Sequence, residues 1–123
     1  MKFLGFIKAD ESYRHQGPPP ALMEAMGKFV QESFQSGVLV DTGGLKPSAS
    51  ASRIRIQGGK LTVTDGPFSE TKEVVGGWAI MQGRSKDEVL AVSRRFMELH
   101  QQYWPGWEGT SELYEMEAYG DGP

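Results

Sequence analysis

The chain of 123 residues contains no cysteine and only two histidines, which removes several kinds of chemistry. Without cysteine the chain has no internal disulfide, no thiolate metal ligand and no cysteine nucleophile. The remaining residues show no metal-ligand spacing, no glycine-rich phosphate loop and no nucleophile elbow, so no metal and no cofactor are expected. Absence of cysteine also suits a reducing compartment, and a cytoplasmic location is therefore the expectation.

A strong excess of one charge and a long apolar run are lacking as well. Thirteen Lys and Arg against sixteen Asp and Glu give a net charge of −3. Direct binding of nucleic acid is not expected, because phosphate backbones require clustered basic residues. The apolar run at residues 3–7 ends at Lys8, far short of the ~20 residues that span a bilayer, so no membrane association is expected. No linker or repeat interrupts residues 1–123, which indicates a single domain.

Apolar periodicity predicts the order strand, helix, strand, hairpin, strand, helix, strand. The expected strands are residues 3–8, 38–42, 53–57, 60–64, 77–82 and 112–119, and the expected helices are residues 21–36 and 86–104. Gly58 and Gly59 indicate a tight hairpin turn, while Ser85 and Glu88 have the spacing of a capping box. This order is typical of an α+β fold, the ferredoxin-like sandwich, in which both helices cover one face of the sheet.

Two of the expected strands, residues 3–8 and 77–82, are apolar on both faces. In the first of them Phe3 points to one side of the strand and Leu4 to the other. Two helices can cover only one face of the sheet, and the sequence predicts no third long helix. We therefore expect a second copy of the chain to cover the other face, which makes the protein a homodimer.

The segment at residues 64–73 (TDGPFSETKE) is the most distinctive part of the chain. Together with residues 43–47 (GGLKP), it resembles the signature of the YCII-related, or DGPF-domain, family over most of the chain. The resemblance implies a dimeric α+β barrel, in which two ferredoxin-like sheets pack face to face with a cleft in each subunit. The family's biochemical role is poorly defined. Some relatives resemble muconolactone isomerase in fold, and some are encoded with or fused to sigma factors.

Some relatives also carry a proposed His–Asp pair, whose histidine lies in the first helix. The matching region here, residues 26–28 (MGK), has no histidine. His15, in the loop before the helix, would rebuild a comparable pair if it swung over the sheet to meet Asp41; a solvated loop histidine is the alternative. His100 lies beside the apolar stripe of the second helix and is interpreted as a satisfied, partly buried histidine. A histidine-dependent mechanism is therefore not expected.

Two interpretations of residues 64–73 stay open. In the first, Asp65 begins a turn, Phe68 anchors that turn to the core, and the later charges are solvated. In the second, the turn brings Asp65, Glu70 and Lys72 to the rim of a cleft, where a carboxylate moves protons and the ammonium holds an anionic metabolite. The substrate-binding candidates that flank these residues are Phe68, Gly76, Gly77 and Trp78.

Two classes of function follow from these patterns. The first is a cofactor-free enzyme, an isomerase, lyase or hydrolase, that applies acid–base chemistry to a small anionic metabolite. The second is a non-catalytic dimer that binds a small ligand or a transcription partner linked to a sigma factor. Two further patches each have two interpretations. The basic hairpin residues Arg53, Arg55 and Lys60 form either a surface for an anion or acidic partner or an ordinary solvated face. The aromatic residues Tyr103, Trp104 and Trp107 form either a stacking platform or a cap on the core or part of a subunit interface.

Overall fold

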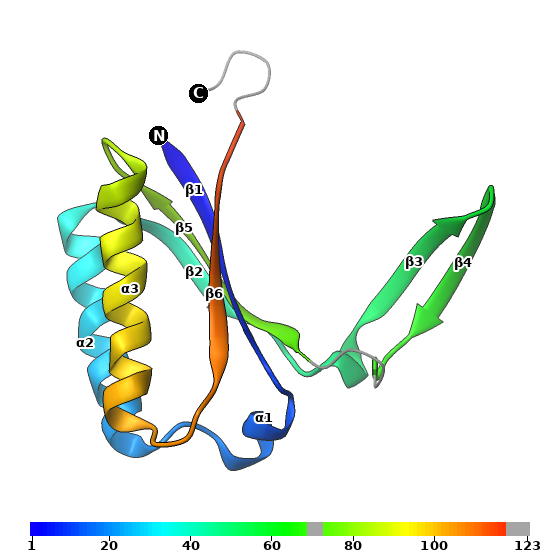
Figure 1. Ribbon diagram of the computed structural model, residues 1–123, viewed down its shortest axis with the longest axis horizontal. Coiled ribbons are helices and arrows are strands. Elements are labelled where there is room, and N and C mark those ends of the chain that lie inside the picture. The colour runs from blue at the N-terminus through cyan, green and yellow to red at the C-terminus, as the bar shows by residue number, and fades with distance from the viewer. Residues whose placement is uncertain (69–72, 118–123) are drawn as a thin grey trace.

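The computed structural model describes residues 1–68 and 73–117, apart from the side chains of Arg14 and His15. The elements, in chain order, are β1 (Lys2–Ala9), α1 (Ser12–Gln16), α2 (Pro20–Ser36), β2 (Leu39–Gly44), the 3-10 helix η1 (Ser48–Ser50), β3 (Ser52–Gln57), β4 (Lys60–Asp65), β5 (Val74–Gln82), α3 (Lys86–Tyr103) and β6 (Gly109–Glu115) (Figure 1). None of the described helices is long and apolar enough to cross a bilayer.

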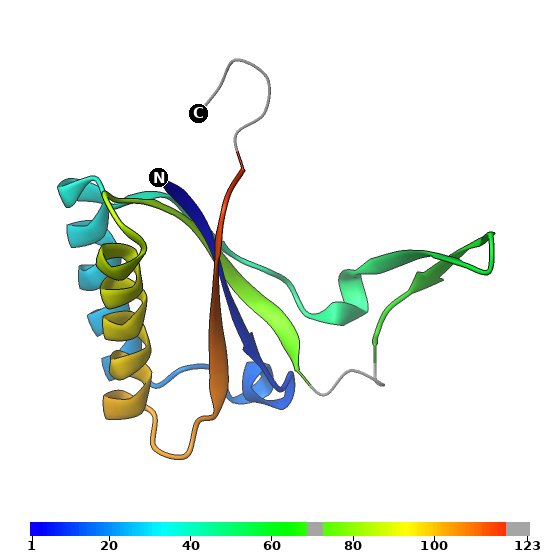
Figure 2. The ribbon, with the colours of Figure 1, turned by 45° about the horizontal axis from the view of Figure 1, so that its top comes forward.

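Four strands form one antiparallel sheet in the order β2-β5-β1-β6. The helices α2 and α3 lie side by side against one face of this sheet, and no described helix covers the other face (Figures 1 and 2). The molecule is therefore an α+β protein whose strand order is compatible with a ferredoxin-like sandwich. The predicted central strands and the placement of both helices on one face are confirmed.

The buried core lies between the sheet and the helices, at the end where β1 begins. Phe3, Leu39, Met81 and Val89 form its buried cluster. Met81 pairs with Phe3 on one side and with Leu39 on the other, so three neighbouring strands supply side chains at one level. Val89 completes the cluster from the first turn of α3. Leu22, in the first turn of α2, is also fully buried but lies outside this cluster.

The predicted boundaries that depend on local chemistry are confirmed. The Ser85 hydroxyl accepts a hydrogen bond from the backbone N–H of Glu88 at 3.2 Å, which caps α3. Gly37 ends α2 in the left-handed conformation, with φ of 83°. Gly58 and Gly59, with φ of 59° and 75°, form the hairpin turn between β3 and β4.

Other predicted boundaries are wrong, and tertiary pairing explains the differences. A short helix, α1, replaces part of the expected loop, and its Tyr13 ring contacts the rings of Trp104 and Trp107. Strand β6 runs from Gly109 to Glu115 rather than from 112 to 119, because its register follows the length of β1. Residues 109–111 (GTS) lack the alternating apolar pattern, so periodicity misses them. Residues 118 and 119 lie outside the described part of the chain.

Strand β5 begins at Val74, three residues before the predicted start, and contains a bulge. Ile7 of β1 pairs with Gly77, whereas the next residue, Lys8, pairs with Val75. Gly76 is therefore the extra residue of the bulge, and the glycine pair lies inside the strand. This bulge accounts structurally for at least one of the two adjacent glycines.

The hairpin of β3 and β4 is a separate two-stranded sheet. Both ribbon views show it projecting away from the four-stranded sheet on the side opposite α2 and α3 (Figures 1 and 2). We call residues 52–65 the arm. The predicted hairpin is confirmed, but its projection from the body is not visible in the sequence.

Candidate functional site: a cavity between the helices and the sheet

A cavity of about 580 Å³ lies between the four-stranded sheet and the helices α2 and α3. This volume falls within the range of roughly 300–1,000 Å³ that is usual for small-molecule sites. Its apolar walls include Met26, Phe29, Val30, Leu39, Val92, Phe96, Trp104 and Trp107. The polar side chains in its walls include Ser33, Thr42, Ser93 and His100.

Small residues on the sheet account for the space. Gly5 of β1 pairs directly with Ala79 of β5, and Ile7 pairs with Gly77 two residues further along. Gly5, Ala79 and Gly77 all line the cavity. Larger residues at these positions would fill the gap beneath the helices, since interiors are otherwise packed to crystal-like density. The sequence thus creates the cavity by placing glycine and alanine opposite two helices with bulky side chains.

His100, on α3, is the polar residue that stands out in this wall, because only 7% of it is exposed. Its Nδ1 lies 3.0 Å from the carbonyl oxygen of Phe96. A carbonyl only accepts hydrogen bonds, so Nδ1 carries the hydrogen and, in the neutral ring, Nε2 is an acceptor. Burial lowers the pKa of His100, which keeps the ring neutral at pH 7.

The Nε2 atom of His100 is accessible from the cavity. It has no hydrogen-bond partner in the described chain, yet within those residues no fully buried side-chain nitrogen or oxygen lacks a partner. Nε2 is therefore not sealed within the protein. The ring is held by aromatic neighbours, with centroids 4.6 Å from Trp107 and 5.0 Å from Phe96. The result is a fixed, neutral imidazole with one available lone pair.

The hydroxyl groups in the wall also present acceptors to the cavity. The Ser33 hydroxyl donates to the carbonyl oxygen of Phe29 at 2.7 Å, and the Thr42 hydroxyl donates to the carbonyl oxygen of Trp78 at 2.7 Å. Their hydrogens are thus used within the protein, and their oxygen lone pairs remain. Together with Nε2 of His100, these atoms favour a ligand that donates hydrogen bonds. A carboxylate would lose its hydration here without gaining donors.

A second hollow, of about 570 Å³ and more open to solvent, lies between the base of the arm and the sheet. Its lining includes three basic residues, Lys8, Lys46 and Arg53, together with Phe68 and Glu73. The guanidinium of Arg53 lies over the Phe68 ring, 4.0 Å from its centroid. We call this hollow the arm groove.

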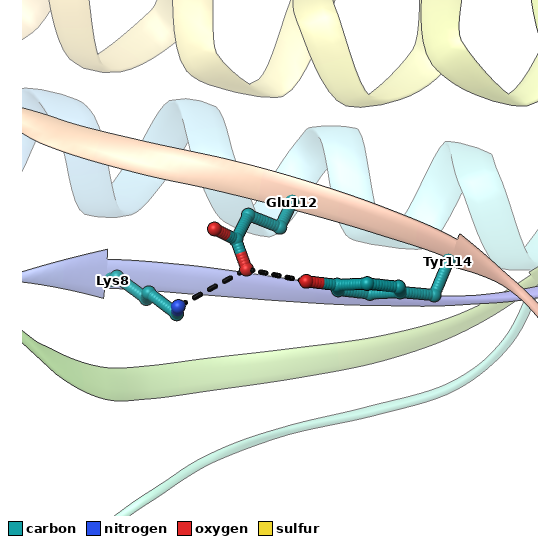
Figure 3. Close-up of polar contacts among 3 residues, drawn as sticks. All are labelled: Lys8, Glu112 and Tyr114. Atoms are coloured by element: carbon teal, nitrogen blue, oxygen red, sulfur yellow. Dashed lines mark hydrogen bonds and ion pairs between the residues drawn. The ribbon is translucent and has the colours of Figure 1, made fainter.

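A polar cluster on β1 and β6 fixes the charge of Lys8 at the edge of the arm groove (Figure 3). Its Nζ lies 3.1 Å from Oε1 of Glu112, and the Tyr114 hydroxyl donates to the same oxygen at 3.0 Å. These hydrogen bonds lower the pKa of Glu112, while the Glu112 carboxylate raises the pKa of Lys8 and of Tyr114. At pH 7 Lys8 is therefore positive, Glu112 negative and Tyr114 neutral, so the positive charge of Lys8 is already balanced.

The turn at residues 65–68 (DGPF) packs against η1. The backbone N–H of Gly66 donates to the carbonyl oxygen of Ala51 at 2.8 Å, and that of Phe68 donates to the Ser48 hydroxyl at 3.2 Å. A Cβ added to Gly66 would lie only 1.7 Å from the carbonyl oxygen of Ser48, so this approach requires glycine.

Glu11 completes the support of this turn from the segment between β1 and α1. Its carboxylate accepts hydrogen bonds from both the backbone N–H and the hydroxyl of Ser48. Ser48 is buried, so these hydrogen bonds connect the segment between β1 and α1 to the DGPF turn through one residue. Asp65, by contrast, is exposed and accepts a hydrogen bond from the Ser52 hydroxyl at 2.9 Å, which joins the two ends of the arm.

The structure divides the predicted site residues between these two hollows. Gly76, Gly77 and Trp78 line the cavity, whereas Phe68 lines the arm groove. Asp65 lines neither hollow, although it is only three residues from Phe68, which lines the arm groove. Glu70 and Lys72 lie outside the described residues.

Only one member of the proposed His–Asp pair, Asp41, has a described side chain. His15 belongs to α1, but its side chain is outside the description. Asp41 is an exposed residue of β2, and its carboxylate accepts a hydrogen bond from the backbone N–H of Thr42 at 2.9 Å. Among residues 1–68 and 73–117, no three His, Asp or Glu side chains gather as a metal site would require.

The expectation of a satisfied, partly buried His100 agrees with its burial and with the hydrogen bond of its Nδ1. The sequence does not reveal that this histidine lines a cavity. The missing signal is not on α3 itself. It is the small residues Gly5 and Ala79 on the opposing strands, which periodicity counts as ordinary strand positions.

Comparison with known protein families identifies the family to which the chain belongs. The YCII-related domain matches residues 1–98 of the chain. The protein therefore belongs to the YCII-related family. The match ends just before His100, so the aromatic residues around the histidine lie beyond the matched segment.

One relative is an uncharacterized protein of Rhizobium meliloti (strain 1021). It is 32% identical over 73 residues, which are 59% of this chain and 59% of the relative. The chain thus matches less than two thirds of the length of that relative. Its description names no activity, so family membership leaves the function to be argued from the site.

Proposed function

We propose that this YCII-related protein binds a small, largely apolar molecule in the helix–sheet cavity and that His100 serves there as a general base. The observation that carries the proposal is the neutral imidazole in the cavity wall, with Nδ1 fixed by Phe96 and Nε2 open. A buried, neutral histidine can take a proton from a bound molecule near neutral pH.

The chemistry this arrangement supports is cofactor-free proton transfer. Nε2 of His100 takes a proton from a C–H or O–H group, and the electron pair of that bond stays on the substrate. The imidazolium then returns the proton at a second atom of the same molecule, so atoms and charge balance without a co-reactant. An isomerisation fits this cycle, which agrees with the acid–base class expected from the sequence.

The cavity also indicates the chemistry of the ligand. Its walls are mainly apolar, and Ser33, Thr42 and His100 offer acceptors. A neutral molecule with an apolar body and a hydroxyl or N–H donor matches these groups. An aromatic ring suits the stacked side chains of Trp104 and Trp107.

Two small probes, p-cresol and p-xylene, test this proposal because they differ by one hydroxyl donor. Tryptophan fluorescence is a suitable readout, since Trp104 and Trp107 line the cavity. We expect p-cresol to bind more tightly to the wild type, and His100→Phe to remove most of that preference. Equal binding of both probes to the wild type would contradict the role of Nε2.

A cavity-filling variant with a matched control locates the binding. Val92 lines the cavity, whereas Leu90, two residues away on α3, is 47% exposed. Val92→Phe should abolish probe binding while the protein stays folded by circular dichroism. Leu90→Phe should bind as the wild type does. Binding that survives in Val92→Phe would place the probe elsewhere.

A second candidate function is the binding of a small anionic metabolite in the arm groove. Lys46 and Arg53 line this groove beside Phe68, and this lining supports the candidate. Lys72 and Glu70, which follow Phe68 closely in the sequence, are the proposed partners in holding the anion and moving protons. Lys46→Ala should then weaken the thermal shift caused by citrate at low ionic strength. Lys86→Ala, an exposed lysine at the start of α3, is the control.

We also propose that the protein is a homodimer in which the sheets of the two copies pack face to face as a barrel. The face of the sheet away from the helices carries Leu4, Phe6, Ile80 and Tyr114. Leu4 pairs with Ile80 on one side and with Tyr114 on the other. The ring centroid of Phe6 lies 6.1 Å from that of Tyr114. We call this surface the open face. A second copy that covers this face must bury more than about 1,000 Å² in total to form a stable interface. Light scattering should give twice 13.6 kDa at micromolar concentration.

A further inference from the structure

One face of the arm carries four exposed aliphatic side chains, with Ser52 and Asp65 at its base. Ile54 pairs with Val63, and Ile56 pairs with Leu61. Residues directly opposite each other, and residues two apart, share a face of a hairpin, so all four point the same way. Their exposed fractions are 68%, 64%, 73% and 60% respectively. The opposite face carries Arg53, Arg55, Thr62 and Thr64.

This apolar face is not explained by the chain on its own. The arm forms a separate two-stranded sheet that projects from the body (Figures 1 and 2). An isolated hairpin is marginally stable in water, and adjacent exposed aliphatic residues mark an interaction surface. A face of this kind is therefore expected to be covered by another surface.

The position of the arm indicates what covers it. The arm projects on the side of the sheet opposite α2 and α3, which is the side of the open face (Figure 2). A second copy seated on the open face would therefore lie beside the arm. By two-fold symmetry, the arm of that second copy would lie beside the first protomer in the same way.

Charge supports a second copy as the partner. The arm carries Arg53, Arg55 and Lys60 against one acidic residue, Asp65. The whole chain has a net charge of −3, so the remainder is more acidic than the chain as a whole. A basic arm and an acidic body attract each other when they belong to different copies.

We propose that the arm is a dimerisation element: its apolar face, formed by Ile54, Ile56, Leu61 and Val63, packs against the second copy that covers the open face. This inference rests on the proposed homodimer and adds the surface that stabilises it. Each protomer then buries its own arm and open face against its partner. This mutual burial of the two arms explains why aliphatic residues occupy a hairpin that projects from the body.

Two charge-matched double variants test the arm. Ile56→Glu with Leu61→Glu adds two negative charges to its apolar face. Thr62→Glu with Thr64→Glu adds the same charge to the opposite face of β4. Sedimentation equilibrium should show at least a tenfold weaker dimer for the first pair. The second pair, which changes the charge but leaves the apolar face, should weaken the dimer far less.

Cross-linking identifies the surface that the arm contacts, and it adds no charge to the apolar face. The chain has no cysteine, so Leu61→Cys accepts a single maleimide benzophenone label. Mixed ¹⁴N and ¹⁵N chains then distinguish contacts between copies from contacts within one. We expect cross-links between copies, ending on β1, β5 or β6. Thr62→Cys, labelled in the same way, should give far fewer.

The outcomes separate the arm from the dimer itself. A dimer unchanged by Ile56→Glu with Leu61→Glu, with Leu61 cross-links confined to one chain, would overturn the role of the arm and leave the homodimer standing. A wild-type protein that stays monomeric at micromolar concentration would overturn both. Arm-dependent binding of that monomer to phosphatidylserine vesicles would assign the apolar face to a lipid surface instead.

Discussion

The imidazole of His100 donates its Nδ1 hydrogen to the carbonyl oxygen of Phe96, 3.0 Å away and one turn earlier in α3. This contact fixes the tautomer and the tilt of the ring. It also leaves Nε2 as the one unused acceptor of the histidine, in a wall built by aromatic residues. The functional proposal depends on this relationship.

The first prediction concerns the pH dependence of stability. Burial lowers the pKa of His100, so the folded protein takes up this proton at lower pH than the unfolded chain. Below about pH 6.5 the unfolded state therefore binds more protons, and this contribution to stability falls as the pH drops. The slope from one group is at most about 1.4 kcal/mol per pH unit.

Urea unfolding between pH 5 and 8 measures this effect. His100→Phe should show a shallower loss of stability toward pH 5, and above about pH 7 the histidine should contribute no slope. Identical slopes in the wild type and the variant would show that burial does not displace this titration.

The second prediction compares two glycines by chemical denaturation. Gly66→Ala places a Cβ 1.7 Å from the Ser48 carbonyl oxygen, a backbone atom that cannot turn aside. We expect a loss of about 1–3 kcal/mol, as for other overpacked sites. Gly27, inside α2, has nothing within 4 Å of such a Cβ, so Gly27→Ala should stabilise the protein. The gain should be about 0.5–1 kcal/mol from helix propensity.

The third prediction concerns Ser48, which connects Glu11 to the DGPF turn. Ser48→Ala removes the hydroxyl that donates to Glu11 and accepts from the N–H of Phe68. We expect a loss of about 1–3 kcal/mol, because a charged acceptor and a backbone donor each lose a partner. Faster amide exchange at Phe68 should accompany the loss. Ser50→Ala, an exposed serine in the same 3-10 helix, should change stability by less than about 0.5 kcal/mol.

The fourth prediction concerns the cluster in Figure 3. The Glu112 carboxylate raises the pKa of Tyr114 by accepting its hydrogen bond and by repelling the phenolate. Glu112→Gln should therefore lower the pKa of Tyr114. Spectrophotometric titration at high pH measures this, with Tyr114→Phe identifying the contribution of that tyrosine. An unchanged titration would show that the pair is open in solution.

Much of the fold was predictable because local rules and tertiary structure agree. The Ser85 cap, the Gly37 end of α2 and the Gly58–Gly59 turn each follow from the preferences of a few neighbouring residues. Strand β6 was misplaced because its length is set by pairing with β1. Residues 109–111 pair well but carry no apolar alternation, so a local pattern cannot reveal them.

The candidate site was less predictable, because a cavity belongs to several elements at once. Gly76, Gly77 and Trp78 were chosen as substrate-contacting residues, and they do line the cavity. Their neighbours in the prediction, Asp65 and Phe68, lie elsewhere, since residues close in sequence can leave a strand in different directions. His100 became a candidate only when the small side chains of the facing strands were known.

The sequence by itself determined the six strands, the two long helices, their order and the family, because short-range propensity and apolar period depend on neighbouring residues. It also determined that the open face and the arm carry aliphatic side chains. It did not reveal the short helices α1 and η1. Only the tertiary structure decided where the empty volume lies, which nitrogen of His100 faces it and that the arm projects from the body. These properties depend on which surfaces meet across the chain, and contacts between distant residues are set by packing rather than by local pattern.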